Sequence, residues 1–307
     1  MARNLKYQLK TCVDKNFKEG MDKHSDKKNK VEKGKKIYSY SDRKNLIDFT
    51  ANFANFMKEN YEEIKMVKDI KSEYIQHFLN LKSETCTRET LEQYLSKANK
   101  MRNLINITYH KSYVEKFDIE VPVSSSSKQV VKDKQITREH YELVKNNIRG
   151  NGLKAIELGS TFGLRVSEIT KLQKRDIDLD KREVRVIDGK GQRSRNIPIE
   201  TKDQWRVAIE IKEITQGDDY QRVVPIKANG VNMSITRAME KCNLDREYVG
   251  NKVHSFRKLY AQENFDRYRE DGYSIKESLG RVSEFLGHSE ERGQDKELIN
   301  RYVKDIK

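Results

Sequence analysis

Basic residues and one tyrosine recur in the second half of the chain at positions where each could act on a phosphate. Arg165 follows a Gly-containing turn, Thr-Phe-Gly-Leu at 161–164, at the start of a predicted helix. A guanidinium there could combine its fork of donors with helix-end amides to hold a phosphate. The ordinary alternative is a surface ion pair with Glu168, three residues further on.

More candidates follow in order along the chain. His254 and Arg257 lie three positions apart on one face of a predicted helix, so both could reach the same anion. His288 completes a Leu-Gly-His sequence, and Tyr302 follows it. Each has a structural alternative when taken alone: a histidine that only completes hydrogen bonds, a solvated arginine, or a half-buried tyrosine.

A lysine completes the set of candidates. Two strand-like runs, 183–187 and 195–199, flank the turn Asp-Gly-Lys-Gly, which predicts a hairpin with Lys190 at its tip. The turn lacks the spacing and the following Ser or Thr of a P-loop, so no use of ATP is expected. No HExxH sequence or paired cysteines indicate a metal site. We therefore expect no cofactor.

Helical periodicity dominates the elements that must position these residues. Apolar residues at three- and four-residue steps predict three amphipathic helices between residues 41 and 118, the first capped by Ser41 or Asp42. Their aromatic stripes are expected to be core. Further helices are predicted after a Thr137 cap and over 201–214, 231–242, 254–269 and 275–286. The expected fold class is mainly α (α+β) with a small antiparallel sheet.

Charge points to the partner. The chain has 62 Lys and Arg against 48 Asp and Glu, a net charge of +14, so its surface should attract a polyanion, with nucleic acid first. The alternative is a merely soluble, Lys-rich protein. Residues 1–37 contain 12 Lys and Arg and five Asp and Glu, which predicts either a flexible arm along phosphates or a solvated tail.

Other partners and compartments are not favoured. The three cysteines are scattered and odd in number, which is typical of reduced thiols and not of a disulfide framework. No apolar stretch reaches the length of a membrane span, and no secretory signal is visible. A cytoplasmic protein with no membrane partner and no small-molecule substrate is expected.

The order of the chemical residues resembles the active-site series of the tyrosine recombinase, or phage integrase, family. The series here is Arg165, Lys190, His254, Arg257, His288 and Tyr302. The resemblance covers residues 135–307. Composition and periodicity predict the domain order: a basic arm (1–40), a helical core-DNA-binding domain (41–118), a linker (119–134) and a mostly helical catalytic domain (135–307). The helical domain resembles the family's core-binding domain only in general layout, and the first 40 residues match nothing in the family.

The resemblance also implies a reaction. Arg165 and Arg257 would clamp the non-bridging oxygens of a scissile phosphate, and Tyr302 would attack it to form a 3′-phosphotyrosyl link. Glu168 would be the acidic residue behind the first arginine. Two arginines can stabilise the extra negative charge of such a transition state without a metal.

Proton transfers would fall to the remaining residues. By the same resemblance, Lys190 would protonate the departing 5′ oxygen, His254 would assist proton movement, and His288 would hydrogen-bond a phosphate oxygen. The 14 positions from His288 to Tyr302 exceed the usual family spacing, so the intervening charged run must form a loop if the tyrosine is to reach the site. Three other tyrosines are expected to be structural: Tyr260, Tyr268 and Tyr273.

The implied function is site-specific recombination of double-stranded DNA on a mobile element or plasmid. Assembly into a homo-oligomer on DNA is compatible with this function. Two alternatives stay open. One is a relaxase of the same fold that nicks a plasmid transfer origin, and the other is a DNA-binding protein that has lost catalysis. The second is disfavoured because binding alone would not require the tyrosine.

Overall fold

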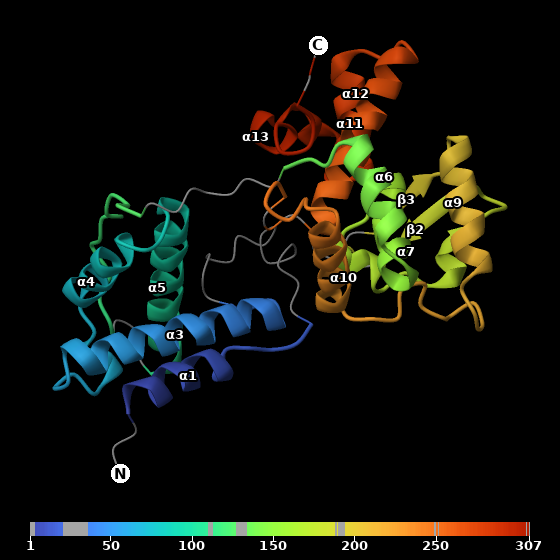
Figure 1. Ribbon diagram of the computed structural model, residues 1–307. Coiled ribbons are helices and arrows are strands. Elements are labelled where there is room, and N and C mark those ends of the chain that lie inside the picture. The colour runs from blue at the N-terminus through green and yellow to red at the C-terminus, as the bar shows by residue number, and fades with distance from the viewer. Residues whose placement is uncertain are drawn as a thin grey trace. The chain divides into compact units, whose positions relative to one another are not determined.

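The computed structural model describes residues 4–20, 36–109, 113–126, 134–187, 189, 194–248, 250, 252–304 and 306. The chain divides into two compact units, Met1–Val130 and Val131–Lys307. Helices dominate both units, and the described residues of the second also form a three-stranded antiparallel sheet (Figure 1). The predicted fold class is confirmed.

In its described residues the first unit contains four helices and a 3-10 turn: α1 (Leu5–Lys15), α3 (Tyr40–Asn60), η1 (Val67–Asp69), α4 (Ser72–Ser83) and α5 (Arg88–Thr108). The predicted aromatic stripe is core, since Phe49, Phe53 and Phe78 are buried and meet edge to face at 5.6–6.0 Å between ring centroids. The predicted cap of α3 was wrong by two residues, because the hydroxyl of Ser39 accepts the backbone N–H of Asp42 at 3.1 Å.

Helix α1 lies in the stretch for which an arm was expected. It buries Leu5, Leu9, Cys12 and Val13 and packs against α3 and α5. For residues 5–15 the expectation of an arm was therefore wrong. The narrow apolar stripe of this helix is too small to stabilise it alone, but it is stable when it packs against two other helices. Burial raises the pKa of the Cys12 thiol to about 11, which suits a core cysteine and not a reactive one.

Replacing Leu9 by alanine should therefore destabilise the protein. Leu9 is fully buried, so the loss of its contacts and the cavity left behind should lower the free energy of unfolding by about 2–5 kcal/mol. Urea denaturation followed by circular dichroism measures this change. Lys6→Ala, on the exposed face of the same helix, is the control, and equal stability of the two variants would show that α1 is not part of the core.

Part of the predicted linker is bound to the first unit. The side chain of Gln76, on α4, exchanges hydrogen bonds with the backbone N–H and C=O of Glu120, both at 3.0 Å. Ser124 donates its hydroxyl to the carbonyl of Cys86 at 2.7 Å, and the N–H of Ser125 donates to the carbonyl of Ser83 at 3.1 Å. Residues 119–126 thus belong physically to the helical unit.

The second unit is built around α7. Its helices are α6 (Arg138–Asn147), α7 (Gly150–Phe162), α8 (Val166–Ile169), α9 (Lys202–Glu213), α10 (Ala228–Lys241), α11 (Val253–Glu270), α12 (Ile275–Phe285) and α13 (Lys296–Ile299), with 3-10 turns η2 (Lys174–Asp176) and η3 (Glu290–Gln294). Helices α9, α10 and α11 all pack on α7, whose residues 155–162 are all buried. Thr137 caps α6 as predicted, since its hydroxyl accepts the N–H of His140 at 3.2 Å.

The sheet has the order β1 (Ile177–Asp178), β2 (Glu183–Val186) and β3 (Arg195–Pro198). Strands β2 and β3 pair antiparallel with Val184 opposite Ile197 and Val186 opposite Arg195. This register puts Arg195 on the same inward face as the apolar residues. Strand β1 was not predicted, because two residues are too few to show a period of two.

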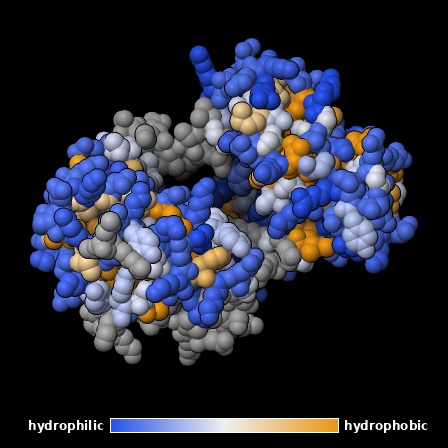
Figure 2. All heavy atoms as spheres, turned by 90° about the horizontal axis from the view of Figure 1, so that it is seen from below, coloured by the Kyte–Doolittle hydropathy of each residue, from blue (hydrophilic) through white to orange (hydrophobic). Residues whose placement is uncertain are grey.

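Polar side chains dominate the exterior. In the view of Figure 2, hydrophilic residues cover most of the visible surface of each unit, and apolar ones form scattered spots. No helix in the described part of the chain combines the length and apolar content that crossing a membrane requires.

Candidate active site

The turn after α7 places Arg165. Gly163 has a left-handed backbone with φ of +61°, and a Cβ there would come within 2.4 Å of the Tyr260 ring. Glycine is therefore required both by the turn and by the approach of α11. Arg165 then stands at the start of α8, where its Nη1 donates to Glu168 Oε1 at 2.7 Å and its Nη2 to the carbonyl oxygen of Leu286 at 2.8 Å.

Glu168 is the buried acceptor that organises this corner. Its carboxylate also accepts the backbone N–H of Arg165 at 2.9 Å and both Nη groups of Arg195 at 2.9 and 3.0 Å. Burial alone would raise the pKa of Glu168, but the hydrogen bonds and charge of Arg195 and the N–H of Arg165 outweigh it and hold the pKa at about 2. Glu168 is therefore ionised at neutral pH.

Arg257 lies in the interior behind Arg165. Its side chain is fully buried on α11 and donates to the carbonyl oxygens of Gly163 and Leu286. Burial and the neighbouring charge of Arg165 lower the pKa of Arg257 to about 10. Because Arg165 and Arg257 donate to the same Leu286 carbonyl, the two guanidinium groups converge on one point.

Tyr302 lies beside Arg257 and two histidines. Its ring centroid is 5.4 Å from that of His254, 6.0 Å from that of His288 and 5.6 Å from the guanidinium carbon of Arg257. The ring is 7% exposed. The structure thus brings Arg165, His254, Arg257, His288 and Tyr302 together, whereas Lys190 lies outside the described residues.

The long interval between His288 and Tyr302 is taken up by η3 and α13. Turn η3 lies on the backbone of α12, where a Cβ at Gly293 would come within 2.7 Å of the Gly280 nitrogen and the Leu279 carbonyl. The carboxylate of Asp295 then caps α13 by accepting the N–H of Leu298 at 3.1 Å. Helices α11, α12 and α13 lie together at the end of the second unit (Figure 1), so the extra residues form the expected loop and Tyr302 still meets His288.

Gly293→Ala should disturb this arrangement. The added methyl group must push η3 away from α12, and α13 with Tyr302 follows. If Tyr302 is the nucleophile, its covalent attachment to DNA should fall by roughly 100-fold, because a displacement near 1 Å is enough for such a loss. Gly230→Ala, where the added Cβ meets only ordinary contacts at 3.5 Å, is the control. Equal adduct yield in both variants, on a denaturing gel, would contradict a close backbone contact.

Two residues of the cluster were missed from the sequence. Arg195 was interpreted only as part of a strand, although an arginine at an inward position of an apolar strand is a signal for a buried partner. Gly287 was noted only as part of the Leu-Gly-His sequence. A Cβ at Gly287 would lie 2.8 Å from Nη1 of Arg195 and 3.1 Å from Nη1 of Arg165, so a side chain there would displace both guanidinium groups.

The competing tyrosines pack in the core. Tyr260 and Tyr268 are almost fully buried. Tyr268 donates its hydroxyl to Glu200 at 2.8 Å, and burial with the charge of Glu200 raises its pKa. Tyr273 lies edge-on to Tyr268 and under the guanidinium of Arg281. These contacts give each of the three a packing role.

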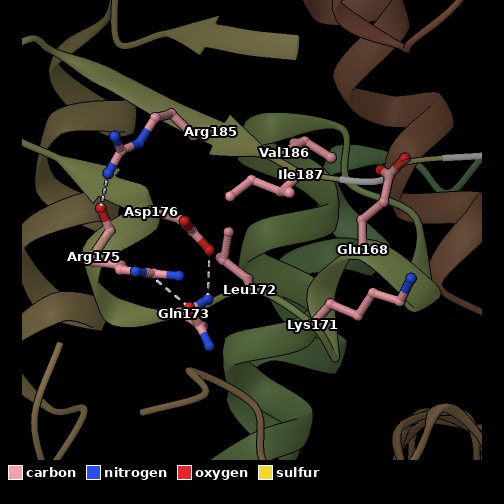
Figure 3. Close-up of a pocket in the computed structure, with 9 residues that line it drawn as sticks. All are labelled: Glu168, Lys171, Leu172, Gln173, Arg175, Asp176, Arg185, Val186 and Ile187. Atoms are coloured by element: carbon pink, nitrogen blue, oxygen red, sulfur yellow. Dashed lines mark hydrogen bonds between the residues drawn. The ribbon is translucent and has the colours of Figure 1, made fainter. Parts of the chain in front are cut away.

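A pocket of about 190 Å³ lies next to this cluster, lined by three cationic side chains and by the acidic residues Glu168 and Asp176. Figure 3 shows Lys171 on one side of it, and Arg175 and Arg185 on the other, where the Arg185 guanidinium reaches the backbone carbonyl of Arg175. The carboxylate of Glu168 points away from the pocket. Three cationic side chains therefore border the site on the side of η2 and β2.

The charges of the cluster do not balance. Arg165, Arg195 and Arg257 surround Glu168, which among the described residues is their only carboxylate partner, leaving a net charge of +2. An uncompensated buried charge is costly, so the site should bind an anion strongly. A phosphate group would supply such a negative charge.

Comparisons with known proteins agree with this geometry. Residues 123–303 match the model of the phage integrase family. No curated protein matches the sequence. The solved structures with a similar fold include XerH recombinase bound to palindromic difH, with a TM-score of 0.63, 14% identity and coverage of 98% of this chain and 91% of that one.

Two further structures share the fold. The Tn1549 transposon integrase with circular intermediate DNA has a TM-score of 0.61 and 14% identity, covering 96% of this chain and 94% of that one. A lambda integrase dimer on a COC′ core site has a TM-score of 0.58 and 17% identity, covering 97% and 81%. The family match extends over more than half of the sequence and includes every candidate site residue. This chain belongs to the phage integrase family, the tyrosine recombinases.

Proposed function

We propose that this protein cleaves and rejoins double-stranded DNA through a covalent link between Tyr302 and a DNA 3′ phosphate. The observation that carries the proposal is the position of the Tyr302 ring, against His254 and His288 and beside the guanidinium of Arg257. In such a cationic setting the side chains themselves can stabilise the negative charge that develops when the tyrosine attacks a phosphate, so the reaction does not require a metal.

The two converging arginines would receive the scissile phosphate. In the free protein Arg165 and Arg257 both donate to the Leu286 carbonyl, so their guanidinium groups lie next to each other. In the reaction the phenol oxygen forms a bond to phosphorus, and the bond from phosphorus to the 5′ oxygen breaks. The transition state carries one more negative charge than the phosphodiester, and the net +2 of the arginine cluster stabilises it.

Protons must move in this step. The phenol loses its proton, and His254 or His288, whose rings contact Tyr302, are the groups we assign to hold or orient it. The departing 5′ oxygen must gain a proton, and we assign this role to Lys190 in the hairpin between β2 and β3. Reversal of the same steps by another 5′ hydroxyl rejoins the strand, so the bond energy is kept and no ATP is needed.

The DNA itself is proposed from charge and from the related structures. The net charge of +14 favours binding to duplex phosphates, and the pocket formed by Lys171, Arg175 and Arg185 offers contacts beside the cleavage site. The lambda integrase, XerH and Tn1549 integrase structures are DNA complexes, some of them with dimers or tetramers. By this likeness we propose that the chain recombines specific sites of a mobile element or plasmid in the cytoplasm, as a homo-oligomer on DNA.

Covalent capture tests the proposal. The protein is incubated with labelled duplex DNA spanning the region that encodes it, denatured, and separated on a gel. A protein-linked DNA band with a free 5′ hydroxyl at the break supports the mechanism. Exchange between two copies of the captured site supports recombination, whereas nicking confined to one site supports a relaxase. DNA binding without any adduct would indicate a catalytically silent member of the fold.

A further inference from the structure

Arg195 directs all three of its guanidinium nitrogens to acceptors within the protein. At the first position of β3, its Nε donates to the carbonyl oxygen of Phe285 at 2.8 Å, and its two Nη groups donate to the two oxygens of Glu168 at 3.0 and 2.9 Å. The side chain is 10% exposed. Such a planar, two-pronged contact fixes the orientation of a carboxylate better than a single bond can.

The carboxylate that Arg195 holds is the one that holds Arg165. Glu168 accepts the Nη1 and the backbone N–H of Arg165, so it fixes both the side chain and the start of α8. Arg195 and Arg165 carry like charges and both lie against Gly287. The ionised Glu168 between them offsets the repulsion of the two guanidinium groups.

We propose that Arg195 is a positioning residue for DNA cleavage, acting on Arg165 through Glu168. The inference rests on the proposed function. Arg195 also joins two parts of the site, since it belongs to β3 and donates to Phe285, the last residue of the helix that leads to His288. Without Arg195, the first arginine loses its orientation and the end of β3 loses its attachment to α12.

Rates of covalent adduct formation on labelled duplex DNA from the encoding region test this role. Arg195→Gln should reduce the rate by roughly 100-fold while DNA affinity changes little, since misorientation of a clamp residue costs about this much. Arg195→Lys keeps the charge and should form the adduct about ten-fold faster than Arg195→Gln. It should not reach the wild-type rate, because a single ammonium replaces the two-pronged guanidinium. The control is Arg206→Gln on α9, whose arginine pairs with the exposed Asp203 and Glu210.

A double-mutant cycle separates positioning from a general loss of structure. If Arg195 acts through Glu168, then Arg195→Gln should lower the rate of adduct formation much less in a Glu168→Gln protein than in the wild type. The two reductions should differ by about ten-fold or more. Additive losses would overturn the inference. Thermal unfolding and near-ultraviolet circular dichroism confirm that each variant is folded.

The pH dependence gives a second readout that a structural role would not alter. The charged groups facing Glu168 are Arg165 from α8, Arg195 from β3 and, at 4.0 Å, Arg257 from α11, with Lys171 in the adjoining pocket wall. Loss of Arg195 removes the largest of the contacts that lower the pKa of Glu168 and leaves burial opposed by Arg165, so the pKa rises. Cleavage by Arg195→Gln should then decline with falling pH at a higher pH than cleavage by the wild type does.

The outcomes separate the two proposals. The double variant Arg195→Gln/Glu168→Gln cannot titrate at position 168 and should lose the added acid limb. If the wild type forms an adduct and Arg195→Gln forms it at the same rate and with the same pH profile, the inference is wrong and the proposed function stands. If the wild type binds the DNA and forms no adduct, both are wrong.

Discussion

Replacing Tyr302 by phenylalanine should abolish covalent attachment to DNA and leave DNA affinity within about two-fold of the wild type. The substitution removes one oxygen and keeps the ring that contacts His254, His288 and Arg257. Without the phenol oxygen no bond to phosphorus can form, and no neighbouring group can replace a covalent nucleophile. Adduct yield on a denaturing gel and affinity from a gel-shift titration measure the two effects separately.

The matched control is Tyr273→Phe, which removes the same atom from a tyrosine that packs against Tyr268 and Arg281. It should form adducts like the wild type. An adduct that persists in Tyr302→Phe would show that another residue is the nucleophile. Loss of binding together with cleavage would mean that Tyr302 supports the DNA surface instead of the chemistry.

Arg257→Lys should lower the rate of cleavage by about 100- to 1,000-fold, the usual cost of removing one preorganised donor from a charged transition state. The guanidinium of Arg257 is fully buried and divides its donors between the carbonyls of Gly163 and Leu286. A lysine keeps the positive charge but cannot span these two acceptors and a phosphate together. Single-turnover adduct formation measures the change.

Arg138→Lys serves as the control for the same substitution. Arg138 also joins two helices, since it binds Glu263 of α11 from α6 and stacks on Tyr141, but it lies outside the cluster of candidate residues. It should cleave at nearly the wild-type rate. Cleavage by Arg257→Lys at nearly the wild-type rate would show that Arg257 does not hold the phosphate. If Arg257→Lys does not fold, the role of Arg257 is in stability alone.

The sequence predicted the elements whose signals are local. Helix α3 follows from aromatic residues at three- and four-residue steps, α6 from its Thr137 cap, and the β2–β3 pair from strand-like runs around a glycine turn. It also predicted which residues gather, because their order resembles a family series. Arg165, His254, Arg257, His288 and Tyr302 do meet in the structure.

The structure alone decided the features that depend on contacts between distant segments. The apolar stripe of α1 is too weak to predict a buried helix until α3 and α5 are there to cover it. The place of Gly293 on α12 explains how a long loop returns Tyr302 to His288, and spacing alone could not show this.

Arg195 shows the physical reason most directly. Its role depends on Glu168, 27 positions earlier, and on the Phe285 carbonyl, 90 positions later, and neither partner leaves a mark in the residues around it. Local sequence determines periodicity, caps and turns because these arise from neighbours along the chain. Which buried charges share a carboxylate is decided only when the packing of α8, β3 and α12 brings them within hydrogen-bonding distance.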